Sequence, residues 1–235
     1  MRKLTALLLA LALTLGLSAA FADTKITVTG SGEVLIPADV AVISLGVNVR
    51  SAEAPSAQAE ANEVIAKIRE ALTAAGIDEE DISTGYINLY AAYDYSSSVE
   101  RITGYNASST LAVKVTDMAR VGEVIDLAFG AGANMLDGVS FSAKDDTAAR
   151  AEALKAAVAD AKAKADVLAE AAGLGELEID SIAESGVYAY DSGANNFSAK
   201  GMITEQAEDA ATVIRAAKIC VSASVTITYE AKEKK

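Results

Sequence analysis

The 235-residue chain contains no histidine and no tryptophan, and it has two prolines and one cysteine. Without an imidazole, it cannot form a Ser-His-Asp or Cys-His catalytic arrangement or a histidine-ligated zinc site. The single cysteine, Cys220, excludes an internal disulfide bond. A G-x-S-x-G motif, a P-loop and a G-x-G-x-x-G motif are also absent. The sequence therefore predicts a protein that is not an enzyme and that carries no cofactor and no metal site.

Positive charge is scarce as well. The chain has 20 Lys and Arg residues against 33 Asp and Glu residues, which gives a formal net charge of −13. Loss of the first 22 residues would remove Arg2 and Lys3 and leave −15. Because phosphate backbones and anionic lipid surfaces are themselves negative, this balance disfavours both as ligands. We expect no nucleic-acid partner.

The start of the chain has the pattern of a secretory signal. A short basic region precedes a nearly uninterrupted apolar run over 4–17, and small residues follow at Ala20 and Ala22. This pattern predicts a signal peptide over 1–22 and an exported mature chain over 23–235, periplasmic or extracellular. An uncleaved membrane anchor is the alternative, although the run is short for a bilayer span. No later stretch has the length of a transmembrane segment, so we expect none after cleavage.

Strand and helix patterns alternate along the mature chain in a definite order. We expect strands over 25–36, 40–49, 82–90, 103–115, 139–143, 177–187 and 217–229, and helices over 55–75, 117–130 and 148–172. The order is β-β-α-β-β-α-β-α-β-β, and its second to fifth strands form the pattern of a split βαβ unit. The predicted fold class is α+β, with helices layered on a mostly antiparallel sheet.

The segment 148–172 is the clearest helix, because alanine fills more than half of it and has the highest helix propensity. Gly173 is suited to the left-handed position that ends such a helix. We predict that the buried stripe consists of Leu154, Val158, Ala161, Ala165, Leu168 and Ala172. A second stripe either packs closely against another element or is exposed alanine that serves as a helix former; it consists of Ala149, Ala153, Ala156, Ala163 and Val167.

The sequence also contains a weak internal repeat. A shift of 97 positions places Gly76-Ile77 on Gly173-Leu174, and Ala92-Tyr93-Asp94 on Ala189-Tyr190-Asp191. The same shift superposes the apolar stripes of the first and third predicted helices. An internal duplication would explain the match. Chance agreement between two helix-Gly-strand connections would also explain it, and the sequence leaves both open.

Four stretches together resemble one known family. They read ITVTGSGEVLIPADVAVISLGV, GYNASSTLAVKVTD, EALKAAVADAKAKADVLAEAAGLG and ELEIDSIAES. In these stretches the mature chain, taken as one α+β domain over 23–235, resembles the SIMPL-domain family of exported bacterial proteins. The resemblance implies an α+β protein, often of the periplasm or cell envelope, with no established catalytic activity.

Tyrosine is the residue type that most suggests a binding role. Predicted strand ends and loops contain Tyr86, Tyr90, Tyr93, Tyr95, Tyr105, Tyr188 and Tyr190. Tyrosine offers a large rigid contact area with a polar tip and is common at interfaces. The alternative is that these side chains cover their own sheet. We select Tyr86, Tyr90, Tyr93, Tyr95, Tyr188 and Tyr190 as candidate interaction residues.

Two classes of function remain open. The first is a non-enzymatic exported envelope protein that forms a homo-oligomer or binds another envelope component. A role in the stress response would extend this function. The alternative is a small-ligand or metal-binding protein, or a hydrolase that relies on carboxylates. The acidic run 78–81 could attract calcium, but a solvated turn explains it better. Cys220 is either a redox-active thiol or, as we expect, inert and partly covered.

Overall fold

The computed structural model describes residues 24–94, 100–192 and 212–232. The predicted signal peptide and Tyr95 lie outside these residues. The strands are β1 (Thr24–Pro37), β2 (Val40–Ser51), β3 (Ile82–Asp94), β4 (Arg101–Val115), β5 (Met135–Ser142), β6 (Leu177–Asp191) and β7 (Lys218–Ala231). The helices are α2 (Ala54–Ala74), α3 (Val121–Gly130) and α4 (Thr147–Ala172), and short 3₁₀ turns precede β3 and α3. This order confirms the predicted α+β sequence of elements.

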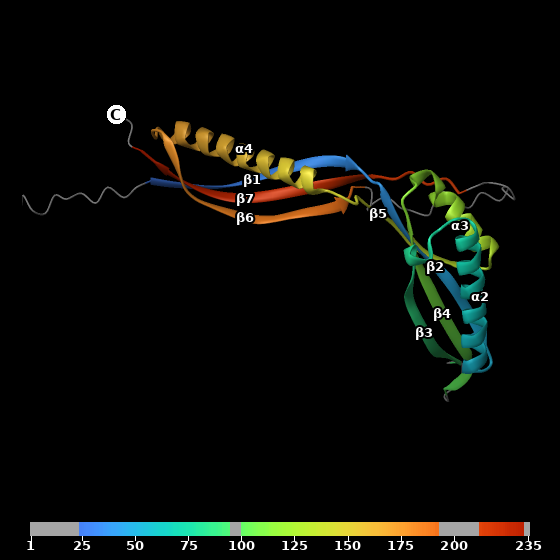
Figure 1. Cartoon of the computed structure of the whole chain (residues 1–235). Coiled ribbons are helices and arrows are strands. Elements are labelled where there is room, and N and C mark those ends of the chain that lie inside the picture. The colour runs from blue at the N-terminus through green and yellow to red at the C-terminus, as the bar shows by residue number, and fades with distance from the viewer. Residues whose placement is uncertain (1–23, 95–99, 193–211, 233–235) are drawn as a thin grey trace, which may run out of the picture. The chain divides into compact units, whose positions relative to one another are not determined.

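The strands form two sheets, where the sequence predicted one. One sheet has the order β3-β4-β2-β5 and the other has the order β1-β7-β6 (Figure 1). The chain divides into two compact units with boundaries inside β1, α4, β6 and β7. The first unit contains residues 24–32, 154–186 and 223–232, and the second contains 33–153 and 187–222 where the structure describes them. Residue periodicity reveals strands but not which strands pair, so the division was not predictable from it.

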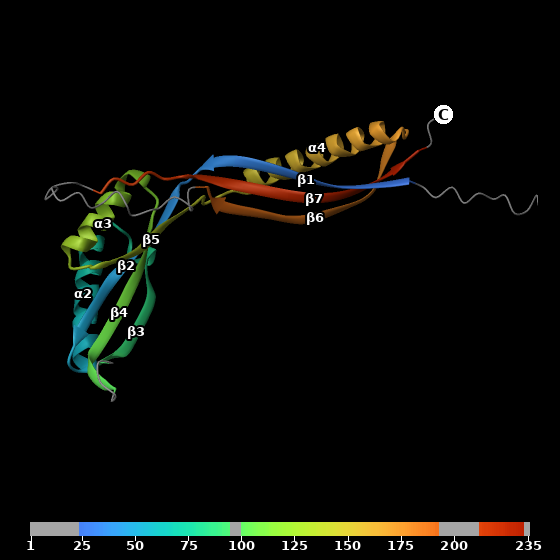
Figure 2. The same cartoon turned by 180° about the vertical axis from the view of Figure 1, so that it is seen from behind.

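The four-stranded sheet is the predicted split βαβ unit. Its strands β2 to β5 pair antiparallel, and α2 and α3 lie on one face of the sheet (Figure 2). The core between them is apolar and almost fully buried; it includes Ala41, Ile43, Leu45, Ile68, Leu72, Leu111, Val113, Val121, Val124 and Ile125. Alternate residues of each strand point into this core, so the intervening residues face away from the helices.

The three-stranded sheet is also antiparallel, and its central strand β7 has one dry face. Apolar side chains of β7 are buried on alternate positions, and hydroxyls occupy the opposite face. There Thr27 pairs with Thr228 at 3.0 Å between their Oγ1 atoms, and Thr29 pairs with Thr226 at 3.4 Å. Because position numbers rise along β1 as they fall along β7, the pairing is antiparallel. Strand β7 thus presents one apolar face to the core and one face of hydroxyls.

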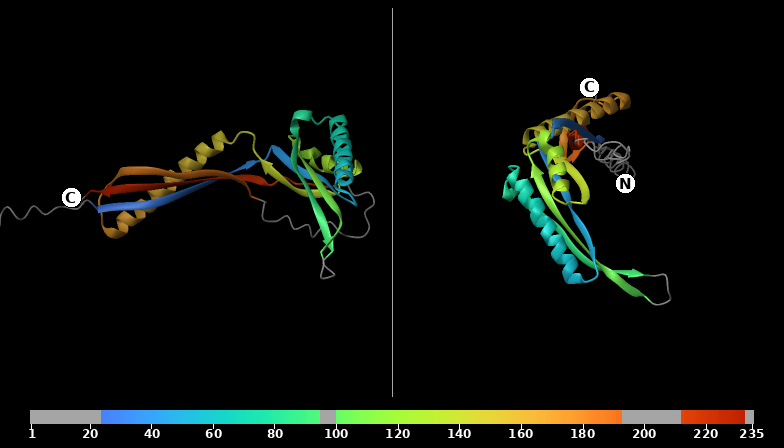
Figure 3. Two further views of the ribbon diagram at one scale, coloured as in Figure 1. Left: turned by 90° about the horizontal axis from the view of Figure 1, so that it is seen from below. Right: turned by 90° about the vertical axis from the view of Figure 1, so that its right-hand side faces the viewer.

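Helix α4 packs on the dry face, and the prediction of its buried stripe was right for Ala161 and Ala165 but wrong for the rest, since Leu154 is half-buried and Ala172 is exposed. The buried residues lie four apart and are all alanine: Ala149, Ala153, Ala157, Ala161, Ala165 and Ala169. Val158 and Leu168, predicted to be buried, are exposed. In the second predicted stripe Ala149 and Ala153 are buried, whereas Ala156, Ala163 and Val167 are exposed. A row of residues four apart is inclined to the helix axis by about 26°, and α4 crosses the strands obliquely (Figure 3).

The position of Gly30 on β1 explains why small residues line the contact between β1 and α4. A Cβ atom added to Gly30 of β1 would lie 2.0 Å from the carbonyl oxygen of Ala157 and 2.7 Å from Cβ of Ala161. The backbones of β1 and α4 therefore approach too closely for larger side chains. The end of α4 follows the prediction, since Gly173 has φ +69° and the Leu174 N–H donates to the Ala169 carbonyl at 2.9 Å.

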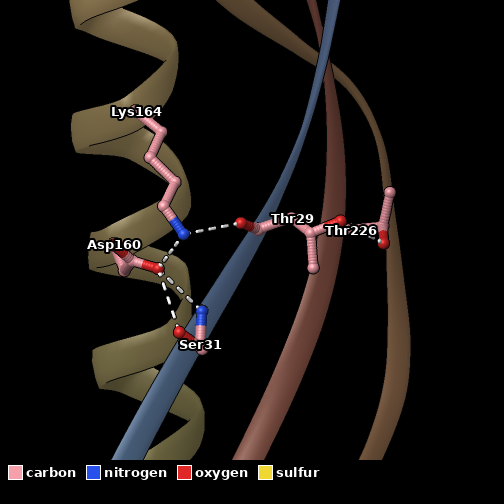
Figure 4. Close-up of polar contacts among 5 residues, drawn as sticks. All are labelled: Thr29, Ser31, Asp160, Lys164 and Thr226. Atoms are coloured by element: carbon pink, nitrogen blue, oxygen red, sulfur yellow. Dashed lines mark hydrogen bonds and ion pairs between the residues drawn. The ribbon is translucent and has the colours of Figure 1, made fainter.

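Two side chains of α4 also bond to the backbone of the edge strand β1. The Ser31 N–H donates to Asp160 Oδ2 at 2.8 Å, and Lys164 Nζ donates to the Thr29 carbonyl oxygen at 3.0 Å (Figure 4). Lys164 also binds Asp160 at 2.7 Å. We call Asp160 and Lys164 the β1 clamp. The clamp occupies a donor and an acceptor of β1 that another strand would otherwise bind.

The clamp predicts a pH-dependent contribution to stability. The hydrogen bond from Lys164, followed by the one from the Ser31 N–H, lowers the pKa of Asp160. A lowered folded-state pKa stabilises the fold above the ordinary aspartate pKa of about 4, and this stabilisation is lost as the pH falls through the folded-state value. Asp160→Asn should therefore melt below the wild type at about pH 7, and the gap should shrink on acidification to about pH 3.

Circular dichroism melts of both proteins check this expectation. Asp166→Asn is the matched control, because Asp166 makes a similar (i, i+4) pair with Lys162 on the same helix but makes no hydrogen bond to a strand of the described chain. We expect the control to melt close to the wild type at either pH. Equal losses in the two variants would show that the clamp adds nothing beyond an exposed ion pair.

The arrangement of the two sheets leaves both the duplication and chance open. The chain path β2-α2-β3-β4 gives the pairing order β2-β4-β3. In the other sheet, β1-β7-β6, the strand β1 comes from the start of the chain, whereas the strand directly before α4 is β5, which belongs to the four-stranded sheet. In both, the helix ends at a glycine with positive φ, Gly76 at +87° and Gly173 at +69°. Capping rules account for these glycines.

Candidate interaction surface

The predicted tyrosines lie on two strands. Tyr86, Tyr90 and Tyr93 belong to β3, and Tyr188 and Tyr190 belong to β6. All five are exposed, and the two strands are in different sheets. Each strand is at an edge of its sheet. The structure therefore provides two candidate tyrosine surfaces, one on each of these edge strands.

On β3, two of the tyrosines face away from the helices. Tyr90 lies opposite Asn106, whereas the neighbouring pair Leu89 and Ala107 is on the helix side, where Ala107 is buried. Tyr86 lies at an irregularity in the pairing, and its N–H donates to the Thr110 hydroxyl at 3.0 Å. Side chains alternate along the strand, so Tyr86, which directly precedes Ile87, falls on the helix-free side with Tyr90.

Tyr93 follows a second irregularity, between Ala92 and Tyr93, and lies opposite Ile102. The two irregularities bound a regular stretch of β3, Ile87–Ala92, with the sequence INLYAA. We call this stretch the β3 edge segment. Because β4 pairs with only one side of it, its other side is the rim of the sheet.

Large apolar side chains are exposed on both faces of β3. The exposed fractions are 43% for Tyr86, 59% for Ile87, 41% for Leu89, 47% for Tyr90 and 44% for Tyr93. Scattered exposed apolar residues are ordinary, but a run of them on one edge strand marks a site of association. The sequence analysis did not select Ile87 and Leu89, because their exposure depends on β3 being an edge strand.

The β3 edge segment also lacks the usual protection of an edge strand. It contains no charged residue and no proline. Among the described residues, no hydrogen bond from another element reaches the outer rim of Ile87–Ala91. Strand β1 differs, because the β1 clamp occupies its edge. The β3 edge segment therefore offers free backbone donors and acceptors flanked by exposed apolar side chains.

The β6 tyrosines have a different environment. Cys220 on the neighbouring strand is buried, with 4% of its surface exposed. Its hydrogen bond with the Tyr190 hydroxyl raises the pKa of Tyr190, and the charge of Glu33 adds to the effect. Tyr190 thus partly covers Cys220, which supports the interpretation of that cysteine as a covered side chain. Tyr188 is the more exposed of the two.

One hollow of about 720 Å³ lies on the four-stranded unit beside α2 and α3. Two carboxylates line it, and both already accept bonds: Asp126 from the Thr212 N–H at 3.0 Å, and Glu123 from Arg120 Nε at 3.2 Å. The remaining lining is mainly apolar. These carboxylates stabilise local structure, so the hollow gives no specific support to the predicted alternative of a carboxylate-dependent hydrolase.

Potential metal ligands do not gather within the described parts of the chain, where no group of three His, Cys, Asp or Glu side chains could hold an ion. In the acidic run 78–81, residues Glu79–Asp81 form a short 3₁₀ turn, and Asp81 binds Lys114 at 2.9 Å. A shallow apolar groove of about 590 Å³ lies between β1 and α4 and includes Val28, Val167 and Leu168. None of the described helices is long and apolar enough to cross a bilayer.

Comparison with known proteins gives a consistent result. The model of the SIMPL family, described as a protein of unknown function (DUF541), matches residues 26–229. A 26 kDa periplasmic immunogenic protein from Brucella melitensis is 35% identical over 165 residues, which cover 68% of this chain and 66% of that protein. The uncharacterized protein YggE from Escherichia coli is 29% identical over 144 residues, 61% of this chain and 58% of YggE.

The matched region spans less than two thirds of the length of each of these relatives. The family match, in contrast, extends over both compact units and over nearly every strand and helix that the structure describes. The predicted resemblance is confirmed: the chain belongs to the SIMPL family, whose function is unknown.

Proposed function

We propose that this chain is an exported periplasmic protein without catalytic activity, which acts by binding further copies of itself or another envelope component through β3. The observation that carries the proposal is the β3 edge segment, an uncharged rim with exposed apolar residues on both faces. A long apolar edge strand without protection associates readily, so a protein that keeps one has a use for it. The name of the Brucella relative supports the periplasmic location.

The tyrosines make this surface more suitable for specific binding than for general adhesion. Tyr86 and Tyr90 supply rigid contact area at a small cost in side-chain entropy, and Asn88 between them can adapt its hydrogen bonds. Such a mixture is typical of protein-binding surfaces. Because the chain has a net charge of −13, it repels other acidic surfaces. Contact with a partner is therefore most favourable at an uncharged part of the surface such as the β3 edge segment.

A double variant, Tyr86→Ser with Tyr90→Ser, tests the proposal. We expect it to lower the mass-average sedimentation coefficient across a concentration series and to leave the melting temperature nearly unchanged, because both side chains are already exposed. Tyr188→Ser is the matched control, since Tyr188 is exposed on an edge strand of the other sheet. We expect the control to sediment like the wild type.

A photo-cross-linking residue at position 90 extends the test to intact cells, where it should give a defined product with a second copy or with another envelope protein. If the double variant associates like the wild type, the β3 tyrosines do not contribute to the association. A wild type that is monomeric at every concentration and gives no cross-link from position 90 would contradict the proposed function.

A further inference from the structure

We infer that two copies of this chain join by antiparallel pairing of their β3 edge segments, with Leu89 of one copy directly opposite Leu89 of the other. This inference rests on the proposed function and names both the partner and the register. It follows from the free rim of β3, the alternation of its side chains and its lack of charge.

The geometry of a symmetric pair limits the register. When two identical strands pair antiparallel about a two-fold axis, the axis is perpendicular to the sheet, so each face of one copy continues into the same face of the other. Residues that lie opposite each other then share a face, and one residue must lie on the axis. The part of the rim that no other described element reaches by a hydrogen bond is Ile87–Ala91, and Leu89 is its central residue.

In this register the side chains of each face match. On the helix side, Leu89 meets Leu89 of the other copy and Ile87 meets Ala91, which covers the two exposed aliphatic side chains of the segment. On the helix-free side, Asn88 lies opposite Tyr90, and the two Tyr90 rings lie diagonally within reach of each other. The combined sheet would contain eight strands, four from each copy.

The lack of charge on β3 makes it the surface through which a second, equally acidic copy can approach. Each chain has a formal charge of −13, so two copies repel at most approaches. Between Ile82 and Tyr93, strand β3 has no charged residue, and Asp94 is at its far end. A strand that is uncharged and apolar on alternate positions is complementary to itself. The β1 clamp closes another strand edge of the chain, which directs strand pairing toward edges such as β3 that remain open.

Engineered cysteines test the register. The native thiol, Cys220, is buried, so an introduced cysteine would be the accessible one among the described residues. Directly opposite residues have Cα atoms about 4.5–5.5 Å apart, within the roughly 4.4–6.8 Å that a disulfide bond spans. Leu89→Cys should therefore form a disulfide-linked dimer on mild oxidation of the mature chain, detected on a non-reducing gel.

Asn88→Cys is the matched control. In the inferred register the two copies of residue 88 are diagonal neighbours about 7–8 Å apart, which is too far for a disulfide. We expect several-fold less dimer from Asn88→Cys than from Leu89→Cys, and none from the wild type. A mixture of Asn88→Cys and Tyr90→Cys chains, which keeps Leu89, should give the mixed dimer in preference to either homodimer.

The outcomes separate this inference from the proposed function. If the protein associates but the cysteines at 88 and 89 cross-link equally, or neither cross-links, the inferred pairing is wrong. Association would then take place through another surface. A monomer that cross-links from position 90 only to a different envelope protein would overturn the second copy as partner. A protein that is monomeric and forms no cross-link from position 90 would contradict both the inferred pairing and the proposed function.

Discussion

Replacement of Gly30 by alanine is expected to lower the free energy of unfolding by about 1–3 kcal/mol or more, the range for overpacked cores. The added Cβ would lie 2.0 Å from the Ala157 carbonyl oxygen and 2.6 Å from the Ala161 amide nitrogen. Both are backbone atoms of α4, so no side-chain rotation relieves the clash. The helix must move away from β1, which also weakens the β1 clamp beside it.

Urea denaturation followed by circular dichroism measures this effect. Gly130→Ala is the matched control, because a Cβ at Gly130 would meet no atom within 4 Å and the residue closes α3 without a positive φ. The control should change stability by less than about 1 kcal/mol and could increase it. If Gly30→Ala proved as stable as Gly130→Ala, the close contact of α4 with β1 would be wrong.

Introduction of a charge at the centre of the β3 edge segment should have the largest effect on association. Leu89→Lys places two like charges opposite each other on the inferred two-fold axis and removes an apolar contact from each copy. We expect the dissociation constant of the dimer to rise by about 100-fold or more, which corresponds to about 2.8 kcal/mol. Because Leu89 is already exposed at 41%, the fold of each copy should be retained.

Leu35→Lys is the matched control, since Leu35 is a similarly exposed leucine on β1. Analytical ultracentrifugation of both variants gives the dissociation constants, and melts verify that each is folded. A Leu89→Lys protein that associates as tightly as the control would remove β3 from the interface.

The element order was predictable because each element has a strong period. The buried residues of α2 recur at helical spacing, those of β4 follow mainly a strand alternation, and Gly173 has the positive φ expected of a helix-ending glycine. The burial of α4 was not predictable in the same way. Hydrophobicity favours Val158 and Leu168 over alanine for the core, but the closeness of α4 to Gly30 admits only small side chains.

The candidate surface shows the same limit of local sequence information. Tyr86 and Tyr90 could be selected because tyrosine is common at interfaces. Ile87 and Leu89 could not, because their exposure depends on β3 being the edge of a sheet, which is a matter of strand order. The β1 clamp was likewise hidden, since Asp160 and Lys164 look like an ordinary (i, i+4) helix pair until β1 lies beside them.

The central claim is that this SIMPL-family chain acts by binding through β3 and that its first partner is a second copy. Light scattering on a sizing column, with mature chain 23–235 across a concentration series, tests it most directly. We expect a mass of at least a dimer that persists on dilution in the wild type and falls to the monomer in Leu89→Lys. A wild type that elutes with the mass of a monomer at every concentration would contradict the claim.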